Sequence, residues 1–177
     1  VLIHEEDPIP GAPEFIGRVN RLPETLAYPR PIQPRIPIWV GGSGPRTTLR
    51  LVAQYADGCN LFGEPDVVAE RVATLDRHCA AIGRDRRAIT VTQLSTVLIG
   101  RDRAEVATLV ERLRPRRWSA ERFAAHVNAG TVDDHRRRIE RFAAAGVDEL
   151  IVRLADIGEP GAIERLGALV AAVNSPR

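Results

Sequence analysis

Residues 36–62 read IPIWVGGSGPRTTLRLVAQYADGCNLF, and this stretch decides the fold. Residues 36–40 form a short apolar run, which predicts a strand, and a glycine-rich turn of four residues, 41–44, follows it. After Pro45, apolar residues recur at positions 49, 52, 53 and 56, the spacing of one helix face. The pair Asp57-Gly58 ends that helix, and residues 59–62 predict a second short strand.

The same alternation of strand and helix continues to the end of the chain. Residues 89–99 and 149–154 predict two further strands, and the segments between them carry helical apolar stripes. The last stripe is Ile163, Leu166, Val170 and Val173, behind a first turn that contains Pro160. The predicted helix caps are Asp66, Asp102 with Glu105, Ser119, and Thr131 with Asp134.

Strands that alternate with helices require a parallel sheet covered by helices, so the predicted fold class is α/β. Four such units fit a small open sheet, or half of an eight-stranded barrel. A complete barrel needs about 250 residues, and this chain has 177. Residues 1–35 hold seven of the 13 prolines and are expected to form an extended leader or insertion; residues 36–177 form the α/β part.

Composition excludes several classes of protein. The chain is 44% hydrophobic and 27% charged, with 25 basic residues against 23 acidic ones and a net charge of +2, so wholesale disorder is not expected. No apolar run approaches the roughly 18 residues of a membrane span, and no secretory leader opens the chain, so a cytoplasmic protein is expected. The chain has no Met, so we expect it to be processed, trimmed or part of a longer protein. Cys59 and Cys79 form no CxxC motif and predict buried, reduced thiols.

The strongest candidate site is the turn after the first predicted strand. Glycines there let backbone amides approach an anion, and the start of the following helix adds a partial positive charge. The turn matches neither the Walker loop nor the dinucleotide GxGxxG spacing, and a plain turn between strand and helix is the alternative. The candidate phosphate-binding residues are Gly41, Gly42, Ser43, Gly44, Arg46 and Thr47.

The wider sequence resembles the luciferase-like monooxygenase family. The resemblance rests on PRPIQ at 29–33, IPIWVGGSG at 36–44, LRLVAQYADGCN at 49–60, GTVDDH at 130–135 and AAAGVDELIV at 143–152. More narrowly, the chain is similar to the oxidoreductases of that family that use the deazaflavin coenzyme F-420.

The resemblance implies a (β/α)8 barrel of which this chain supplies strands five to eight. It further implies that the turn after strand five holds the phosphate of coenzyme F-420, with FMN as the alternative. The expected function is then a flavin- or deazaflavin-dependent oxidoreductase acting on a small molecule, without nucleic acid or membrane partners. The rival hypothesis is a non-catalytic half-barrel that assembles with itself or with a separate N-terminal half, because the outer strands of a half-barrel have unpaired edges.

Other polar residues give weaker signals. Asn60, Glu64 and Asp156 follow predicted strands and could reach a substrate, but such residues are more often turn or cap residues, and no catalytic residue is assigned. His78, His126 and His135 lack metal-ligand spacing. His78 and His135 lie on or beside helical stripes, which predicts helix-surface or boundary positions for these two. The arginine runs at 112–117 and 136–138 are interleaved with acidic residues and predict solvated helix faces rather than a nucleic-acid site.

Overall fold

The computed structural model describes residues 15–16, 21–22, 32 and 35–175. The chain divides into two compact units, residues 1–36 and 37–177. In the first unit, β1 (Phe15–Ile16) pairs with β2 (Arg21–Leu22) in an antiparallel arrangement. Most of the expected extended leader, residues 1–35, lies outside the described residues.

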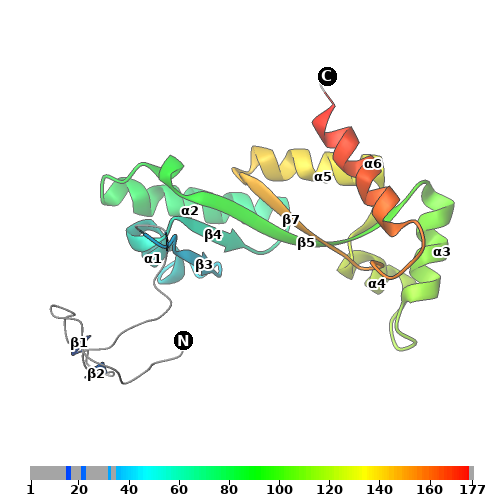
Figure 1. Ribbon diagram of the computed structural model, residues 1–177, viewed down its shortest axis with the longest axis horizontal. Helices are drawn as coiled ribbons and strands as arrows, with labels where there is room; N and C mark the ends of the chain where they lie inside the picture. The colour runs from blue at the N-terminus through cyan, green and yellow to red at the C-terminus, as the bar shows by residue number, and fades with distance from the viewer. Residues whose placement is uncertain (1–14, 17–20, 23–31, 33–34, 176–177) are drawn as a thin grey trace. The chain divides into compact units, whose positions relative to one another are not determined.

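The second unit is built on a parallel sheet (Figure 1). β3 (Trp39–Gly41) pairs with β4 (Gly58–Leu61), β4 pairs with β5 (Thr90–Gly100), and β5 pairs with β7 (Glu149–Leu154). All of these pairings are parallel, which confirms the predicted α/β fold with a parallel sheet. The three-residue strand β6 (Ala129–Thr131) was missed from the sequence; it pairs with the last three residues of β5.

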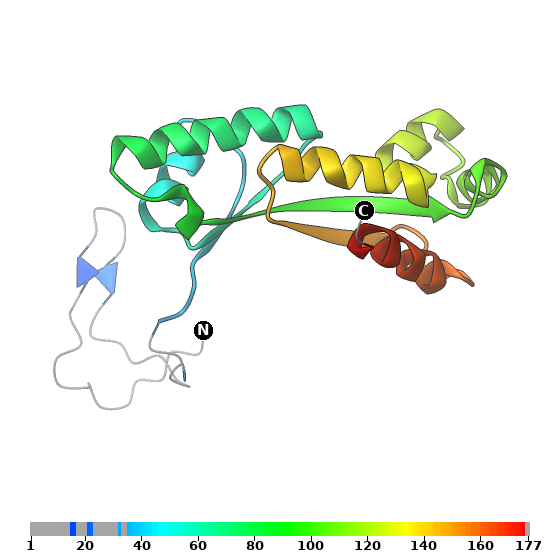
Figure 2. The same ribbon diagram turned by 90° about the horizontal axis from the view of Figure 1, so that it is seen from above.

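Helices connect the strands, as the alternation predicts. They are α1 (Thr48–Tyr55), α2 (Pro65–Ala81), α3 (Arg103–Leu113), α4 (Ala120–His126), α5 (Val132–Ala144) and α6 (Ala162–Asn174), with a 3-10 turn η1 (Arg86–Ala88). Figure 2 shows α2 and α5 following one another along β5.

Three helix caps were predicted correctly. Asp102 accepts a hydrogen bond from the Glu105 amide, and Ser119 accepts one from the Arg122 amide. Thr131 and Asp134 form a complete capping box at the start of α5. These caps are local in sequence, so the pattern alone is enough to find them.

Three other predictions about helix starts were wrong. The N-cap of α2 is Glu64, because Pro65 fixes the first turn and Asp66 falls inside it. The Glu105 carboxylate accepts a bond from the Arg101 amide rather than from Asp102, so the box at α3 is not closed. Pro160 lies ahead of α6, whose N-cap is Gly161 at φ 78°.

The two faces of β5 are covered differently. On one face, Val91, Val97 and Ile99 are buried in clusters that include residues of α2, α5 and α6. Leu98 points to the opposite face, where α3 and α4 cover it. We call this second face the inner face; away from α3 and α4 it is partly open, although Thr92 on the same face is buried. It carries Trp39, Leu94 and Ile151, which are 52%, 37% and 48% exposed.

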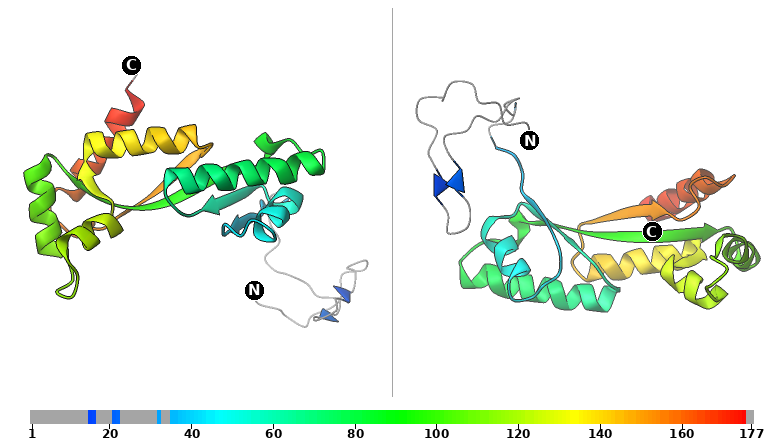
Figure 3. Two further views of the ribbon diagram at one scale, coloured as in Figure 1. Left: turned by 180° about the vertical axis from the view of Figure 1, so that it is seen from behind. Right: turned by 90° about the horizontal axis from the view of Figure 1, so that it is seen from below.

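Helix α6 departs from its predicted stripe. Ile163, Val170 and Val173 are exposed, while Ala162, Arg165 and Leu169 are buried and Leu166 is half-buried. Figure 3 shows α6 beside β7 in two further views. Because the stripe is apolar and faces outward, this side of α6 lacks a packing partner within the described residues.

Candidate functional site

Glycine is required at two positions of the turn that joins β3 to α1. Gly42 has φ +129°, a conformation that L side chains rarely adopt. A Cβ at Gly44 would lie 2.8 Å from Thr48 Oγ1. The bare backbone therefore forms the surface of the turn.

Hydrogen bonds tie the turn to its neighbours. The Gly42 amide donates to the Asn60 carbonyl at 3.2 Å, and the Phe62 amide donates to Ser43 Oγ at 3.3 Å. His78 Nε2 lies 2.8 Å from the Pro45 carbonyl oxygen. Sequence reasoning missed this supporting role of His78, because the contact joins α2 to a turn 33 residues earlier in the chain.

The start of α1 leaves several amides open to a ligand. The Leu49 amide donates to the Gly44 carbonyl, and the Leu51 amide donates to the Thr47 carbonyl. Within the described residues, the amides of Gly44, Arg46, Thr47 and Thr48 donate to no protein acceptor. The first turn of α1 contains no acidic side chain. This arrangement of open amides at a positive helix end suits an anion.

The turn thus brings the six predicted residues Gly41, Gly42, Ser43, Gly44, Arg46 and Thr47 together in one short segment. Arg46 and Thr47 are exposed, and Arg46 makes no ion pair within the described part of the chain. Ser43 uses its oxygen to accept a bond from Phe62, and its own hydroxyl proton stays available to donate.

The polar residues predicted after the other strands do not converge on the turn as a group. Asn60 is on β4 beside the turn, and its Oδ1 accepts a bond from the Thr92 hydroxyl at 2.9 Å. Glu64 pairs with Arg138, whose hydrogen bond lowers the pKa of that carboxyl. Asp156 lies in a turn, as expected, and its side chain forms a buried ion pair with Arg165. Both carboxylates are engaged by arginine.

The histidines occupy three different environments. His78 is half-buried, in keeping with its predicted boundary position, and His126 is exposed. His135 is buried, with Nε2 at 3.3 Å from the Leu98 carbonyl oxygen, so its predicted surface or boundary position was wrong. Burial lowers the pKa of His135. The described residues contain no group of three or more His, Cys, Asp or Glu side chains arranged to hold a metal ion.

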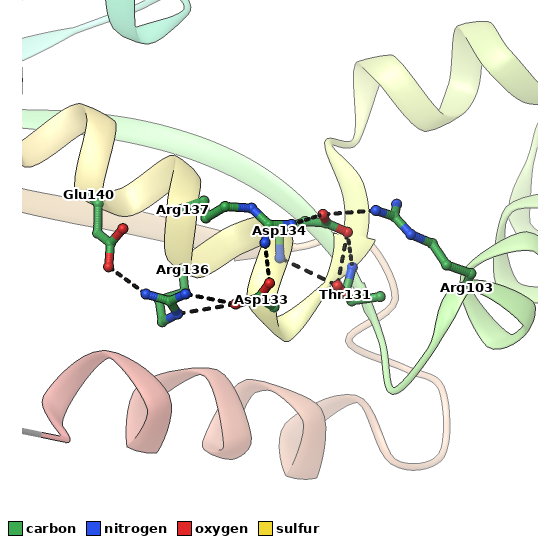
Figure 4. Close-up of polar contacts among 7 residues, drawn as sticks. All are labelled: Arg103, Thr131, Asp133, Asp134, Arg136, Arg137 and Glu140. Atoms are coloured by element: carbon green, nitrogen blue, oxygen red, sulfur yellow. Dashed lines mark hydrogen bonds and ion pairs between the residues drawn. The ribbon is translucent and has the colours of Figure 1, made fainter. Parts of the chain in front are cut away.

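The arginine run 136–138 is paired with acidic side chains. Arg136 contacts Asp133 and Glu140, and Arg137 contacts Asp133 and Asp134 (Figure 4). Arg103 reaches Asp134 from α3 at 2.9 Å. These positive charges are compensated on the helix surface itself, as the interleaved pattern indicates.

No helix among the described residues is long and apolar enough to cross a membrane.

Comparison with known proteins identifies relatives along almost the whole chain. The model of the family described as luciferase-like monooxygenase matches residues 7–173. An uncharacterized protein of Mycobacterium tuberculosis is 32% identical over 71 residues, which cover 40% of this chain and 25% of that protein.

Solved structures show the same fold. An F-420-dependent secondary alcohol dehydrogenase in complex with an F-420–acetone adduct gives a TM-score of 0.69 at 16% identity, over 97% of this chain and 58% of that chain. A coenzyme F-420-dependent tetrahydromethanopterin reductase from Methanopyrus kandleri gives 0.64 at 21% identity, over 87% and 56%. A riboflavin lyase with modified FMN gives 0.68 at 13% identity, over 90% and 48%. The chain spans about half the length of these structures, as expected for a partial (β/α)8 barrel.

Proposed function

Because this chain belongs to the luciferase-like monooxygenase family, we propose that it supplies the phosphate-binding half of a coenzyme F-420-dependent oxidoreductase. FMN is the alternative coenzyme. The turn between β3 and α1 carries the proposal, because its open amides and helix end suit a phosphate.

The residues of the turn fit such a group on three counts. Gly42 and Gly44 carry no side chain that could cover the backbone amides, and a Cβ at Gly44 would collide with the Thr48 side chain. No carboxylate in the first turn of α1 would repel an anion. Arg46 adds an exposed guanidinium that can donate two parallel hydrogen bonds to phosphate oxygens.

When bound, the coenzyme supplies two-electron transfer at its ring system. The part of this chain is to bind and to orient. Amides around Ser43 and Thr47 would hold the phosphate, while the bonds from Phe62 and His78 fix the turn against β4 and α2. Such fixing keeps the ring and a small-molecule substrate in a reactive geometry.

The test is an absorbance and fluorescence titration of the purified chain with F-420 and with FMN. A parallel titration uses the chain combined with the N-terminal half of a related barrel. Binding of F-420 more tightly than FMN supports the proposal. If neither preparation binds either coenzyme, the proposal fails.

A pair of charge variants locates the binding. Arg46→Gln should weaken coenzyme binding about tenfold, or about 1.4 kcal/mol, because a charge-assisted contact to phosphate is lost. Arg50→Gln removes the same charge from an exposed position on α1 and should leave binding within about twofold. Equal effects of the two substitutions would place the phosphate elsewhere.

A second candidate function is assembly, favoured by the exposure on the inner face and on α6. Among the described strands, β3 and β7 each pair on one side only. The predicted stripe residues Ile163, Val170 and Val173 are exposed on α6. An unpaired strand edge next to an apolar helix face favours contact with another chain, either a second copy or a complementary half-barrel.

A further inference from the structure

We propose that a hollow on the inner face binds a small planar monocarboxylate through Arg153. The hollow has a volume of about 420 Å³. Its lining includes the aromatic residues Trp118, Phe123 and His126 and the polar residues Thr96 and Arg153. We call it the Arg153 hollow. Its size falls in the range of small-molecule sites in proteins, about 300–1,000 Å³.

Arg153 is a positive charge without a carboxylate partner among the described residues. Its Nε and Nη2 donate to Thr96 Oγ1 at 3.1 and 2.9 Å. Those bonds hold one edge of the guanidinium and leave the Nη1 side free to donate. By contrast, Arg136, Arg137 and Arg138 are all paired with acidic side chains. A fixed, uncompensated guanidinium selects an anion.

The aromatic lining of the hollow suits a flat, apolar part of a ligand. The Trp118 and His126 rings meet edge to face with centroids 5.0 Å apart, and Trp118 meets Phe123 in the same manner at 6.5 Å. The Arg122 guanidinium covers one face of the Trp118 ring at 4.4 Å, so a planar ligand would pack against the remaining aromatic surface. Among the described residues that line the hollow, Arg153 is the one arginine. A single negative charge therefore matches it better than a dianionic phosphate does.

The position of the hollow links it to the proposed activity. Arg153 lies near the carboxyl end of β7, where parallel sheets of this class place their ligands, and Thr96 of β5 is its partner in the strand register. They share the inner face with Leu94 and Ile151, because side chains alternate along each strand. A substrate role for the carboxylate rests on the proposed oxidoreductase function, whereas binding of the carboxylate does not.

The test uses fluorine NMR with the full chain. The probes are 4-fluorobenzoate and its neutral counterpart 4-fluorobenzamide, with inorganic phosphate as a competitor. We expect 4-fluorobenzoate to bind at least tenfold more tightly than 4-fluorobenzamide. We also expect phosphate to displace 4-fluorobenzoate at least tenfold less well than unlabelled benzoate does. Equal binding of acid and amide, no binding of the acid, or effective displacement by phosphate would each overturn the proposal.

Variants then assign the contact. Arg153→Gln should weaken the acid at least tenfold and leave the amide within twofold, with circular dichroism confirming the fold. Arg77→Gln removes an equal charge from the surface of α2, an element that does not line the hollow, and should change the affinity for neither probe. If Arg153→Gln does not fold, Arg153→Lys replaces it and should weaken the acid at least threefold, because the planar fork is lost. An unchanged affinity in the folded variant refutes the assignment.

The coenzyme titration separates this proposal from the previous one. Carboxylate binding without coenzyme binding would leave the hollow established and the oxidoreductase proposal refuted. Coenzyme binding without carboxylate binding would do the reverse.

Discussion

Thr131 and Asp134 fix the start of α5 by reciprocal hydrogen bonds. The Thr131 amide donates to Asp134 Oδ2 at 3.0 Å, and the Asp134 amide donates to Thr131 Oγ1 at 3.3 Å. Asp134→Ala should lower the free energy of unfolding by about 1 kcal/mol, the usual cost of losing such a cap. The neighbouring Asp133→Ala, which removes only exposed ion pairs, should cost less than about 0.5 kcal/mol. Urea denaturation at pH 7 measures both, and equal losses would contradict the capping role.

The same cap sets an acid dependence. Hydrogen bonds from Thr131 lower the pKa of Asp134 to about 2, below its ordinary value of 3.8. A lowered pKa means that the carboxylate stabilises the fold above pH 3.8, and that this contribution is lost as the pH falls toward 2. The difference between wild type and Asp134→Ala should therefore shrink across that interval.

Cys59 should be chemically inert in the folded protein. It is fully buried, and burial raises the pKa of its thiol to about 11. Burial raises the pKa of Cys79 as well. Because the thiolate is the reactive form, a disulfide reagent at pH 8 should leave both thiols unmodified in the native state and label both in urea. Because the pKa of Cys59 is higher in the folded than in the unfolded protein, the contribution of this thiol to the stability of the fold is fully present below pH 9. It is lost as the pH rises toward 11. Rapid labelling of native protein would show that the thiols are accessible.

Residue-scale features were predictable where the cause is local. The caps Ser119 and Thr131 and the buried thiols follow from spacing and composition. The burial of His135 was not predictable, because it depends on the Leu98 carbonyl 37 positions away.

At the scale of elements, α6 is anchored to the end of β7 by one buried ion pair. Arg165 Nη2 lies 2.5 Å from Asp156 Oδ2, and the two side chains are 8% and 1% exposed. Asp156→Ala should lower the free energy of unfolding by about 1.5–3 kcal/mol, because the buried guanidinium loses its nearest carboxylate and keeps only Glu105, at 3.6 Å, as an acidic partner. The double variant Asp156→Leu with Arg165→Met should lose clearly less, since no buried charge remains. Thermal or urea unfolding measures both, and a double variant as unstable as the single one would exclude this explanation.

The elements themselves were mostly visible in the sequence. The β-branched run of β5 and the glycines that end the other segments predicted the order of strands and helices. Strand β6 was missed because Ala-Gly-Thr has no strand pattern of its own and is defined only by pairing with β5. The buried face of α6 was missed because the apolar stripe Ile163, Val170 and Val173 predicts burial, whereas these residues are exposed in the fold.

At the scale of the whole molecule, the exposed apolar residues predict association. The chain has a mass of 19.4 kDa, and sedimentation equilibrium should give a larger, concentration-dependent mass. Ile163→Lys with Val170→Lys should return it toward the monomer, because two charges then sit on the apolar face of α6. Glu164→Lys places a positive charge on an exposed polar position of the same helix and serves as the control. A strict monomer at all concentrations would refute association with itself.

The candidate turn could be located from sequence because glycines, a strand and a helix start follow one another within ten residues. The Arg153 hollow could not be located in this way. Its lining comes from β5, β7, α3, α4 and the segment between these two helices, and no spacing in the sequence joins Thr96, Trp118 and Arg153.

The length of β5 has a consequence for how the fold opens. Thr92 and Gln93 are flanked by β4 on one side and β7 on the other. The backbone amides in this part of β5 can exchange with deuterated solvent only when its pairings with β4 and β7 both separate. Such an opening approaches complete unfolding of the sheet. We therefore expect the centre of β5 to be the last part of the described sheet to take up deuterium, and β3, at the outer edge, to be among the first.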